Sequence, residues 1–186
     1  MLILASASPR RRELLEYITP DFVAVAFDLD ERLPPDIPPR AGAEILAKRK
    51  AQAAAGTHPD NIVIGADTIV ALDGVIYEKP KDEQDAFRIL RALSGKEHFV
   101  YTGVAIISPN GERIFSEETA VRFTEMRDED IRAYIKTGDP MDKAGAYGIQ
   151  GRGAVFVSGI RGDFYNVMGL PVCRLARELA QIVAGK

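Results

Sequence analysis

Residues 2–15, LILASASPRRRELL, join a short apolar run, a loop of small residues and the start of a helix. Leu2–Leu4 is typical of a buried strand, Ser8 of a helix N-cap and Pro9 of the first helical position. The stretch therefore predicts a strand–loop–helix unit. Its loop leads to free backbone N–H groups at the positive end of the helix dipole, an arrangement suited to binding an anion.

Three consecutive arginines, Arg10–Arg12, open this helix, although the whole chain has a net charge of −3. Cations at a helix N-terminus oppose the helix dipole, at about 0.3–1 kcal/mol each when exposed. A guanidinium offers a planar pair of donors that fits a phosphate group. Two interpretations stay open at this point: a capped helix with solvated arginines, or a phosphate site, which is slightly favoured.

Outward from this unit, strand-like and helical segments alternate, and two hairpin signals interrupt them at Asp73-Gly74 and Asn110-Gly111. We expect strands at 22–26, 62–71, 98–107, 112–123 and 154–160, and helices at 41–55, between Pro80 and Gly95, at 128–136 and from Pro171. This order favours an α/β fold with a mixed twisted sheet flanked by helices over a purely parallel sheet.

The composition is that of an ordinary globular protein, with 46% hydrophobic and 27% charged residues in a chain of 186. We expect a single domain over 1–186, with two lobes around a cleft. The N-terminal apolar run is too short for a signal peptide and no apolar stretch reaches spanning length, so the expected location is the cytoplasm. The net charge argues against nucleic acid or a membrane as a partner.

The chain has one cysteine, Cys173, and two histidines, His58 and His98. An internal disulfide and a Cys/His zinc cluster are therefore excluded, and we expect both histidines at the surface. Glycine spacings typical of a P-loop or a dinucleotide-binding turn are missing as well.

Asp67 interrupts the otherwise apolar stretch IVIGADTIV, in which Thr68 is the only other polar residue. A buried carboxylate needs a partner, so Asp67 either satisfies loop N–H groups at a strand end or serves as a metal ligand or general base. Glu31, in the acidic segment DLDER, is a second candidate ligand for a hard cation such as Mg²⁺. Taken alone, DLDER is more typical of a solvated loop.

Two lysines and a glycine-rich segment complete the candidates. Lys50 ends the basic KRK run and Lys79 stands in EKP, although lysines on helices usually face solvent. The segment DKAGAYGIQG (142–151) is too rich in small residues for a stable helix, so its backbone is expected to pack closely against another element. Gln150 in this segment carries both donors and an acceptor, which suits a base edge, but a turn without a ligand is as plausible from the segment alone.

Several of these segments together resemble the Maf family of nucleoside triphosphate pyrophosphatases. The matching stretches occur in the family's order and are LASASPRRRELL, LAKRKA, GADTIV, EKP, LSG, DKAGAYGIQG and GLP. The resemblance implies a mixed α/β fold with a cleft between two lobes, similar to the inosine triphosphate pyrophosphatases. It also implies metal-dependent hydrolysis between the α and β phosphates, which limits the incorporation of excess or non-standard nucleotides.

The resemblance also implies roles for individual residues. Arg10, Lys50 and Lys79 would hold phosphates, while Glu31 and Asp67 would bind Mg²⁺ or Mn²⁺ and serve the attacking water, with Asp67 as the proton acceptor. Ser8 and Arg11 belong to the same substrate-binding stretch. The combination of Arg10, Thr68 and Gln150 is similar to the branch that acts on dTTP and UTP; Arg12 is a departure, since a polar residue is expected there.

Two alternatives remain at this stage. The same chemistry on modified nucleotides such as 7-methyl-GTP is the closer one. The other is a non-catalytic nucleotide-binding or DNA-contacting regulator of cell division, which would not need Glu31, Asp67 and Lys79 together. A homodimer is compatible with the sequence, which does not decide the oligomeric state.

Overall fold

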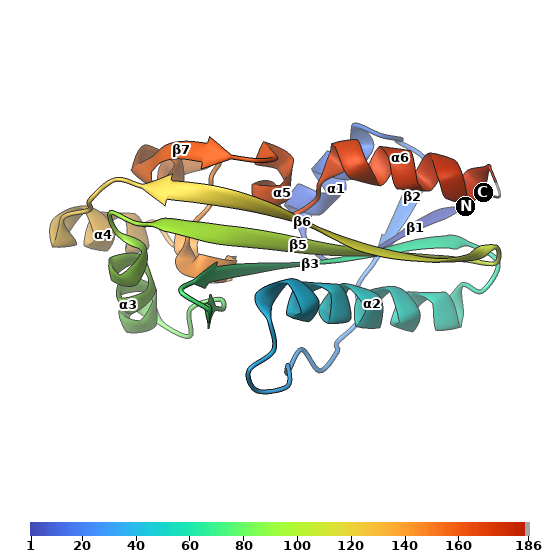
Figure 1. Ribbon diagram of the computed structural model, residues 1–186, viewed down its shortest axis with the longest axis horizontal. Helices are drawn as coiled ribbons and strands as arrows, with labels where there is room; N and C mark the ends of the chain where they lie inside the picture. Colours follow the sequence, from blue (N-terminus) through green and yellow to red (C-terminus); the bar gives the residue numbers. More distant parts are fainter. Residues whose placement is uncertain (185–186) are drawn as a thin grey trace.

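The computed structural model describes residues 1–184, and its centre is a seven-stranded mixed sheet with helices on both faces (Figure 1). The strands are β1 (Leu2–Ala5), β2 (Phe22–Val25), β3 (Ile62–Leu72), β4 (Val75–Tyr77), β5 (Glu97–Ser108), β6 (Gly111–Phe123) and β7 (Val157–Arg161). The α-helices are α1 (Pro9–Glu16), α2 (Pro39–Thr57), α3 (Glu83–Leu93), α4 (Asp128–Ile135), α5 (Phe164–Met168) and α6 (Val172–Val183). Three 3₁₀ helices are η1 (Asp139–Asp142), η2 (Ala144–Ala146) and η3 (Gly151–Phe156).

The sheet has the order β2-β1-β3-β5-β6-β7, with β4 paired to β3 outside this path. Strands β1, β2 and β3 are parallel to one another, while β3, β5, β6 and β7 are joined by antiparallel pairing. The expected mixed sheet flanked by helices is therefore confirmed.

The predicted strand–loop–helix unit is present as β1 and α1. Ser8 is the N-cap of α1, its side chain accepts a hydrogen bond from the Arg11 backbone N–H, and Pro9 takes the first helical position. Leu4 of the strand and Leu14 of the helix are completely buried in one core. The start of α1 is thereby held at the end of β1.

Strand β3 has a gap on one edge at the middle of its length. Strand β1 pairs with β3 only as far as Gly65, and β4 begins to pair at Val70, whereas β5 pairs along the opposite edge through both regions. Residues 66–69 thus have a neighbouring strand on one side only. Because successive side chains of a strand point to opposite faces, Asp67 and Thr68 flank this gap on the two faces of the sheet.

Helix α2 packs unusually closely on the sheet because the contact is made of small residues. A Cβ atom added to Gly65 would lie 2.3 Å from the Ala47 carbonyl oxygen, and one added to Gly103 would lie 2.3 Å from the carbonyl oxygen of Ala43. Neither position therefore tolerates a side chain without moving the helix. This packing brings the polar face of α2 within reach of the strand edge.

Elements gather at the two ends of the long central strands (Figure 1). Helices α3 and α4 lie at one end, while β1, β2, α1 and α6 lie toward the other, and β3, β5 and β6 run between the two groups. Helix α2 covers one face of the sheet, and α1, α5 and α6 lie on the other.

Four sequence-based expectations need correction. The strand expected at 154–160 begins only at Val157, because the glycine-containing stretch before it forms η3. Helix α2 begins at Pro39 and ends at Thr57, so it is longer than 41–55, and α5 was not anticipated. The fourth correction concerns His98.

His98 was expected at the surface but is completely buried, whereas His58 is half-buried at the end of α2. The ring of His98 packs against Phe123 and Tyr147, and its Nε2 atom lies 2.8 Å from the Tyr147 hydroxyl oxygen. Burial lowers the pKa of His98 to about 4, since a charged imidazolium is disfavoured away from water. The residue is therefore a neutral member of the core.

Candidate active site

A cleft of about 670 Å³ opens beside the gap in β3, a volume in the range of small-molecule sites. It is bordered by α1 and the loop after β2 on one side and by η2 and the following glycine-rich turn on the other. All nine candidate residues from the sequence line this cleft: Ser8, Arg10, Arg11, Glu31, Lys50, Asp67, Thr68, Lys79 and Gln150. Residues far apart in the chain are thus brought to one place.

Lys50 links the two candidate carboxylates. Its Nζ atom lies 2.5 Å from Asp67 Oδ1 and 2.6 Å from Glu31 Oε1. The Asp67 side chain is 12% exposed and that of Lys50 is 19% exposed, so this ion pair is largely withdrawn from water. The partner of Asp67 is thus a cation in the cleft. The alternative in which Asp67 only accepts hydrogen bonds from loop N–H groups is therefore wrong.

Glu31 reaches this cluster from the loop between β2 and α2, and its side chain is half exposed. Desolvation favours the protonated form of Glu31, but the hydrogen bond from Lys50 and the charges of Lys50, Lys79 and Arg11 outweigh it. The net result is a pKa below the usual range for a glutamate. Glu31 is therefore a carboxylate anion at neutral pH.

Of the three arginines at the start of α1, only Arg11 is turned inward. Its Nε atom donates to the Gly169 carbonyl oxygen at 2.8 Å, and its Nη2 atom donates to Thr68 Oγ1 at 3.0 Å. Burial lowers the pKa of Arg11, and the nearby charge of Asp67 opposes this shift. Arg12 is exposed and does not line the cleft.

Arg10 is half-buried and forms an ion pair across the cleft. Its Nη1 atom is 3.5 Å from Asp142 Oδ2, and Asp142 also accepts from Lys143 Nζ at 2.7 Å. Asp142 and Lys143 begin the glycine-rich segment, so this contact joins α1 to the segment that carries Gln150. Lys79 lies in the wall of the cleft, is exposed, and is near enough to lower the pKa of Glu31.

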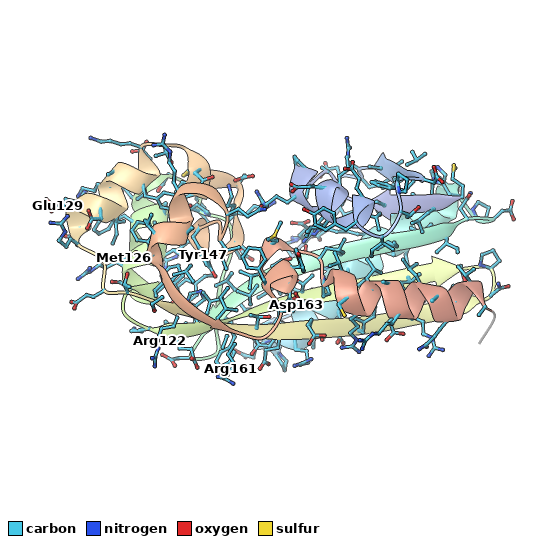
Figure 2. All side chains as sticks on the ribbon, turned by 90° about the horizontal axis from the view of Figure 1, so that it is seen from above. Arg122, Met126, Glu129, Tyr147, Arg161 and Asp163 are labelled. Carbon is cyan, nitrogen blue, oxygen red and sulfur yellow. The ribbon has the colours of Figure 1, made fainter. Side chains whose placement is uncertain are left out.

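The glycine-rich segment packs closely against β3, as its composition predicts. Gly145 has a φ of +71°, and a Cβ atom there would lie 2.8 Å from a methyl carbon of Val70. Gln150 precedes η3 without forming a side-chain cap, is exposed and lines the cleft. Its amide group is therefore available to a ligand. In Figure 2, Tyr147 of this segment lies in the half of the molecule that carries α4, across from the half that carries α1.

Three contributors were not named as site residues from the sequence: Asp142, Gly169 and Thr102. Asp142 opens the conspicuous segment DKAGAYGIQG, and Gly169 opens GLP, so a signal was present for both. Thr102 lies inside an apolar strand and is recognised only through its hydrogen bond to Thr68, which comes from cross-strand pairing.

Over residues 1–184, there is no cluster of three or more His, Cys, Asp or Glu side chains arranged to hold a metal ion. The two carboxylates at Lys50 are the candidate pair that remains. In the same described part of the chain, none of the helices combines the length and the apolar character needed to cross a membrane.

Comparison with known proteins identifies relatives along nearly the whole chain. Residues 1–182 match the family described as Maf-like protein. The chain is 51% identical over 181 residues to a dTTP/UTP pyrophosphatase of Geobacillus sp. (strain WCH70), with 97% of each chain covered. It is 50% identical over 183 residues to a dTTP/UTP pyrophosphatase of Bacillus cytotoxicus, with 98% of this chain and 96% of the relative covered.

Among solved structures, the Ham1 protein of Staphylococcus aureus has a similar fold. The TM-score is 0.50 at 17% sequence identity, and the match covers 66% of this chain and 71% of that one. At this identity the likeness concerns the fold alone. The match along nearly the whole sequence, together with relatives of about half-identical sequence, shows that the chain belongs to the Maf family.

Proposed function

We propose that this protein hydrolyses dTTP and UTP to the nucleoside monophosphate and pyrophosphate. Two full-length relatives that are about half identical in sequence are named dTTP/UTP pyrophosphatases. The single observation that carries the proposal is the convergence of Asp67 and Glu31 on the ammonium group of Lys50, inside a cleft lined by further cations. This arrangement suits a reaction in which water attacks a phosphate that cations hold.

In this reaction the oxygen of water forms a bond to the α-phosphorus, and the bond from that phosphorus to the α–β bridging oxygen breaks. The electron pair leaves with pyrophosphate, and a proton of the water passes to a base. Asp67 is the best candidate for this base because it is poorly exposed, lies in the cleft and is held by Lys50 in one position. Lys50 and Lys79 bind the negative phosphates, together with the N-terminal end of α1.

Arg10 is assigned to the base end of the cleft. Its partner Asp142 begins the segment that carries Gln150, and both of these residues line the cleft. A uracil or thymine ring presents two carbonyl oxygens and one N–H group, which the amide of Gln150, the guanidinium of Arg10 and the hydroxyl of Thr68 are able to contact. Ser8 supports this region indirectly, because its hydroxyl caps α1.

A divalent cation, Mg²⁺ or Mn²⁺, fits the donor set. Carboxylate oxygens of Glu31 and Asp67 lie within 2.6 Å of one nitrogen atom, so they already surround a single positive charge. Mg²⁺ typically uses one or two carboxylates and completes its shell with substrate phosphates and water. Glu31 and Asp67 would hold the ion, which when bound neutralises phosphate charge and makes a water molecule more acidic.

The test is a nucleotide panel with the purified protein and Mg²⁺. The products formed from dTTP, UTP, CTP and 7-methyl-GTP are separated, and the amounts of pyrophosphate and nucleoside monophosphate are both measured. We expect equal amounts of the two from dTTP and UTP, and no activity in a chelator. Orthophosphate as the first product would overturn the proposed reaction, a preference for 7-methyl-GTP would overturn the substrate, and full activity in chelator would overturn the metal requirement.

A further inference from the structure

A chain of hydrogen bonds runs from the cleft into the core through two threonines. Thr68 on β3 and Thr102 on β5 are directly paired across the strands, and their Oγ1 atoms lie 2.9 Å apart. Thr102 is completely buried, while Thr68 borders the cleft. Beyond Thr102, the chain continues to the backbone carbonyl of Asn166 in α5 at 2.8 Å.

The chemistry of the end groups fixes the direction of every hydrogen bond in this chain. The Asn166 carbonyl oxygen can only accept a hydrogen bond, so Thr102 donates its one hydroxyl proton to this oxygen. Thr102 therefore has only lone pairs to offer Thr68, which must donate its own proton to Thr102. At the other end, Arg11 is always a donor, and its Nη2 atom points to Thr68 Oγ1 at 3.0 Å.

The Thr68 hydroxyl is consequently left with one function toward the cleft. Its proton is held by Thr102 and one lone pair is taken by Arg11, so the remaining lone pair is an acceptor. A threonine hydroxyl is in general able to donate or to accept, but these contacts restrict the Thr68 hydroxyl to accepting from the cleft. A hydroxyl that only accepts distinguishes ligand groups that carry a hydrogen from those that do not.

We propose that Thr102 is a specificity-determining positioning residue: it holds the Thr68 proton, so that Thr68 accepts a hydrogen bond from the N3–H group of uracil or thymine. This inference rests on the proposed function and adds to it the polarity of one contact. In a uridine or thymidine nucleotide, N3–H is the only N–H group on the ring. Cytosine has a bare nitrogen at the same position, so its lone pair would face the lone pair of Thr68.

Asn166, at the buried end of this series of hydrogen bonds, is itself held in place, which keeps the direction of the hydrogen bonds fixed. Asn166 is completely buried, and its Nδ2 atom donates to the Val100 carbonyl oxygen at 3.0 Å and to Thr119 Oγ1 at 2.9 Å. Thr119 in turn bonds to the backbone of Asp163, which lies at the start of α5 (Figure 2). The acceptor of the Thr102 proton is thus held by contacts to both β5 and β6.

The main test compares UTP with CTP in Thr102→Val, which removes the hydroxyl at nearly constant size. The Thr68 proton then loses its acceptor and is free to turn toward the cleft. We expect the ratio of kcat/KM for UTP over CTP to fall by about three- to tenfold, the effect of one hydrogen bond. Thr102→Ser keeps the hydroxyl and should keep the ratio within about twofold, since a difference of that size is well below one hydrogen bond.

Two further variants separate this role from a general effect on the core. Ser116→Ala removes another buried hydroxyl group, on β6, whose partners are Arg40 and Glu44 rather than Asn166 or Thr68, so the ratio should stay as in the wild type. In a Thr68→Val background, Thr102→Val should cause no further change in the ratio. The proposal is overturned if Thr102→Val leaves the ratio unchanged, if Ser116→Ala lowers it equally, or if Thr102→Val lowers it again in the Thr68→Val background.

A substrate pair tests the same contact without any substitution in the protein. The compounds 3-methyl-UTP and 5-methyl-UTP are equal in size, but only the second retains N3–H. We expect the wild-type protein to hydrolyse 3-methyl-UTP at least about tenfold more slowly, because the free lone pair of Thr68 Oγ1 then faces a methyl group instead of a donor; equal rates would overturn the inference. Failure of wild-type protein to release pyrophosphate from UTP and dTTP would instead count against the proposed function.

Discussion

Lys50 Nζ lies 2.5 Å from Asp67 Oδ1 and so ties helix α2 to the middle of strand β3, beside the gap in the sheet. The close packing of α2 on Gly65 and Gly103 sets the distance over which this lysine reaches. A carboxylate held in this way keeps one orientation, which suits the general-base role proposed for Asp67.

Asp67→Asn tests the proposed base. The amide keeps the size and can still accept a hydrogen bond from Lys50, so the fold should persist, but it cannot take a proton. We expect kcat with UTP to fall by about 10²–10⁴-fold, the usual contribution of a general base. Steady-state pyrophosphate release measures this, and thermal unfolding checks the fold. Turnover within about threefold of wild type, less than ~1 kcal/mol in barrier, would make Asp67 a structural residue.

Lys50→Met tests the cation that links the two carboxylates, and Lys48→Met is its control in the same helix. Removing the ammonium group takes away charge-assisted hydrogen bonds, so kcat/KM should fall by about 10- to 100-fold. Lys48 pairs with Glu112 outside the cleft, and both of these side chains are more than a third exposed. Its loss should leave kcat/KM unchanged. Equal effects of the two substitutions would contradict a specific role for Lys50.

Arg10→Ala tests the assignment of Arg10 to the base end, with the exposed neighbour Arg12→Ala as control. If Arg10 contacts the base, its removal should lower kcat/KM for UTP and dTTP more than kcat/KM for CTP and 7-methyl-GTP, so that the preference for the first two becomes smaller. The four substrates are compared at fixed Mg²⁺ concentration. A uniform loss for all four would instead place Arg10 on the phosphates, and Arg12→Ala should change none of the ratios.

His98 should make the protein less stable in mild acid. The pKa of His98 is about 4 in the folded protein, against about 6.5 for a free histidine, so the unfolded chain binds more protons between these values. The free energy of unfolding therefore falls as the pH drops from 6.5 toward 4. From pH 7.5 to pH 5 this single group should cost about 2 kcal/mol.

Urea unfolding of wild type, His98→Leu and His58→Ala at these two pH values measures the effect. His98→Leu should lose most of the pH dependence whatever its stability at pH 7.5, while His58→Ala should keep it. If the free energy of unfolding of His98→Leu falls between pH 7.5 and pH 5 as much as that of the wild type, the pKa of His98 does not differ between the folded and unfolded states.

Local patterns in the sequence predict the parts of the fold that local interactions determine. Ser8 and Pro9 mark the start of α1 because capping involves neighbouring residues, and Asp67 is conspicuous because a carboxylate rarely interrupts a buried strand. The family resemblance gathered all nine candidate residues, which line one cleft. Their roles remain predictions.

What the sequence could not provide comes from contacts between distant residues. Arg11 and Gly169 are 158 positions apart, and nothing in either segment specifies their hydrogen bond. His98 lies on the same buried face of β5 as Val100 and Thr102, because every second residue of a strand points to the same side. The period of the strand thus decides its burial and overrides the usual preference of histidine for the surface. Helix α5 has five residues, too few for a helical period to be visible.

Strands β5 and β6 are paired without interruption from Glu97 and Arg122 to Ser108 and Gly111, and β3 passes the cleft as one strand. The elements on the two sides of the cleft are thus built on the same continuous hydrogen-bonded strands. A hinge motion needs a few loop or terminal residues whose backbone angles change, and these strands place none at the cleft. The strand-borne part of the cleft, which includes Asp67 and Thr68, is thus a rigid floor, and any adjustment to a nucleotide falls to the loop after β2 and the glycine-rich segment that border it.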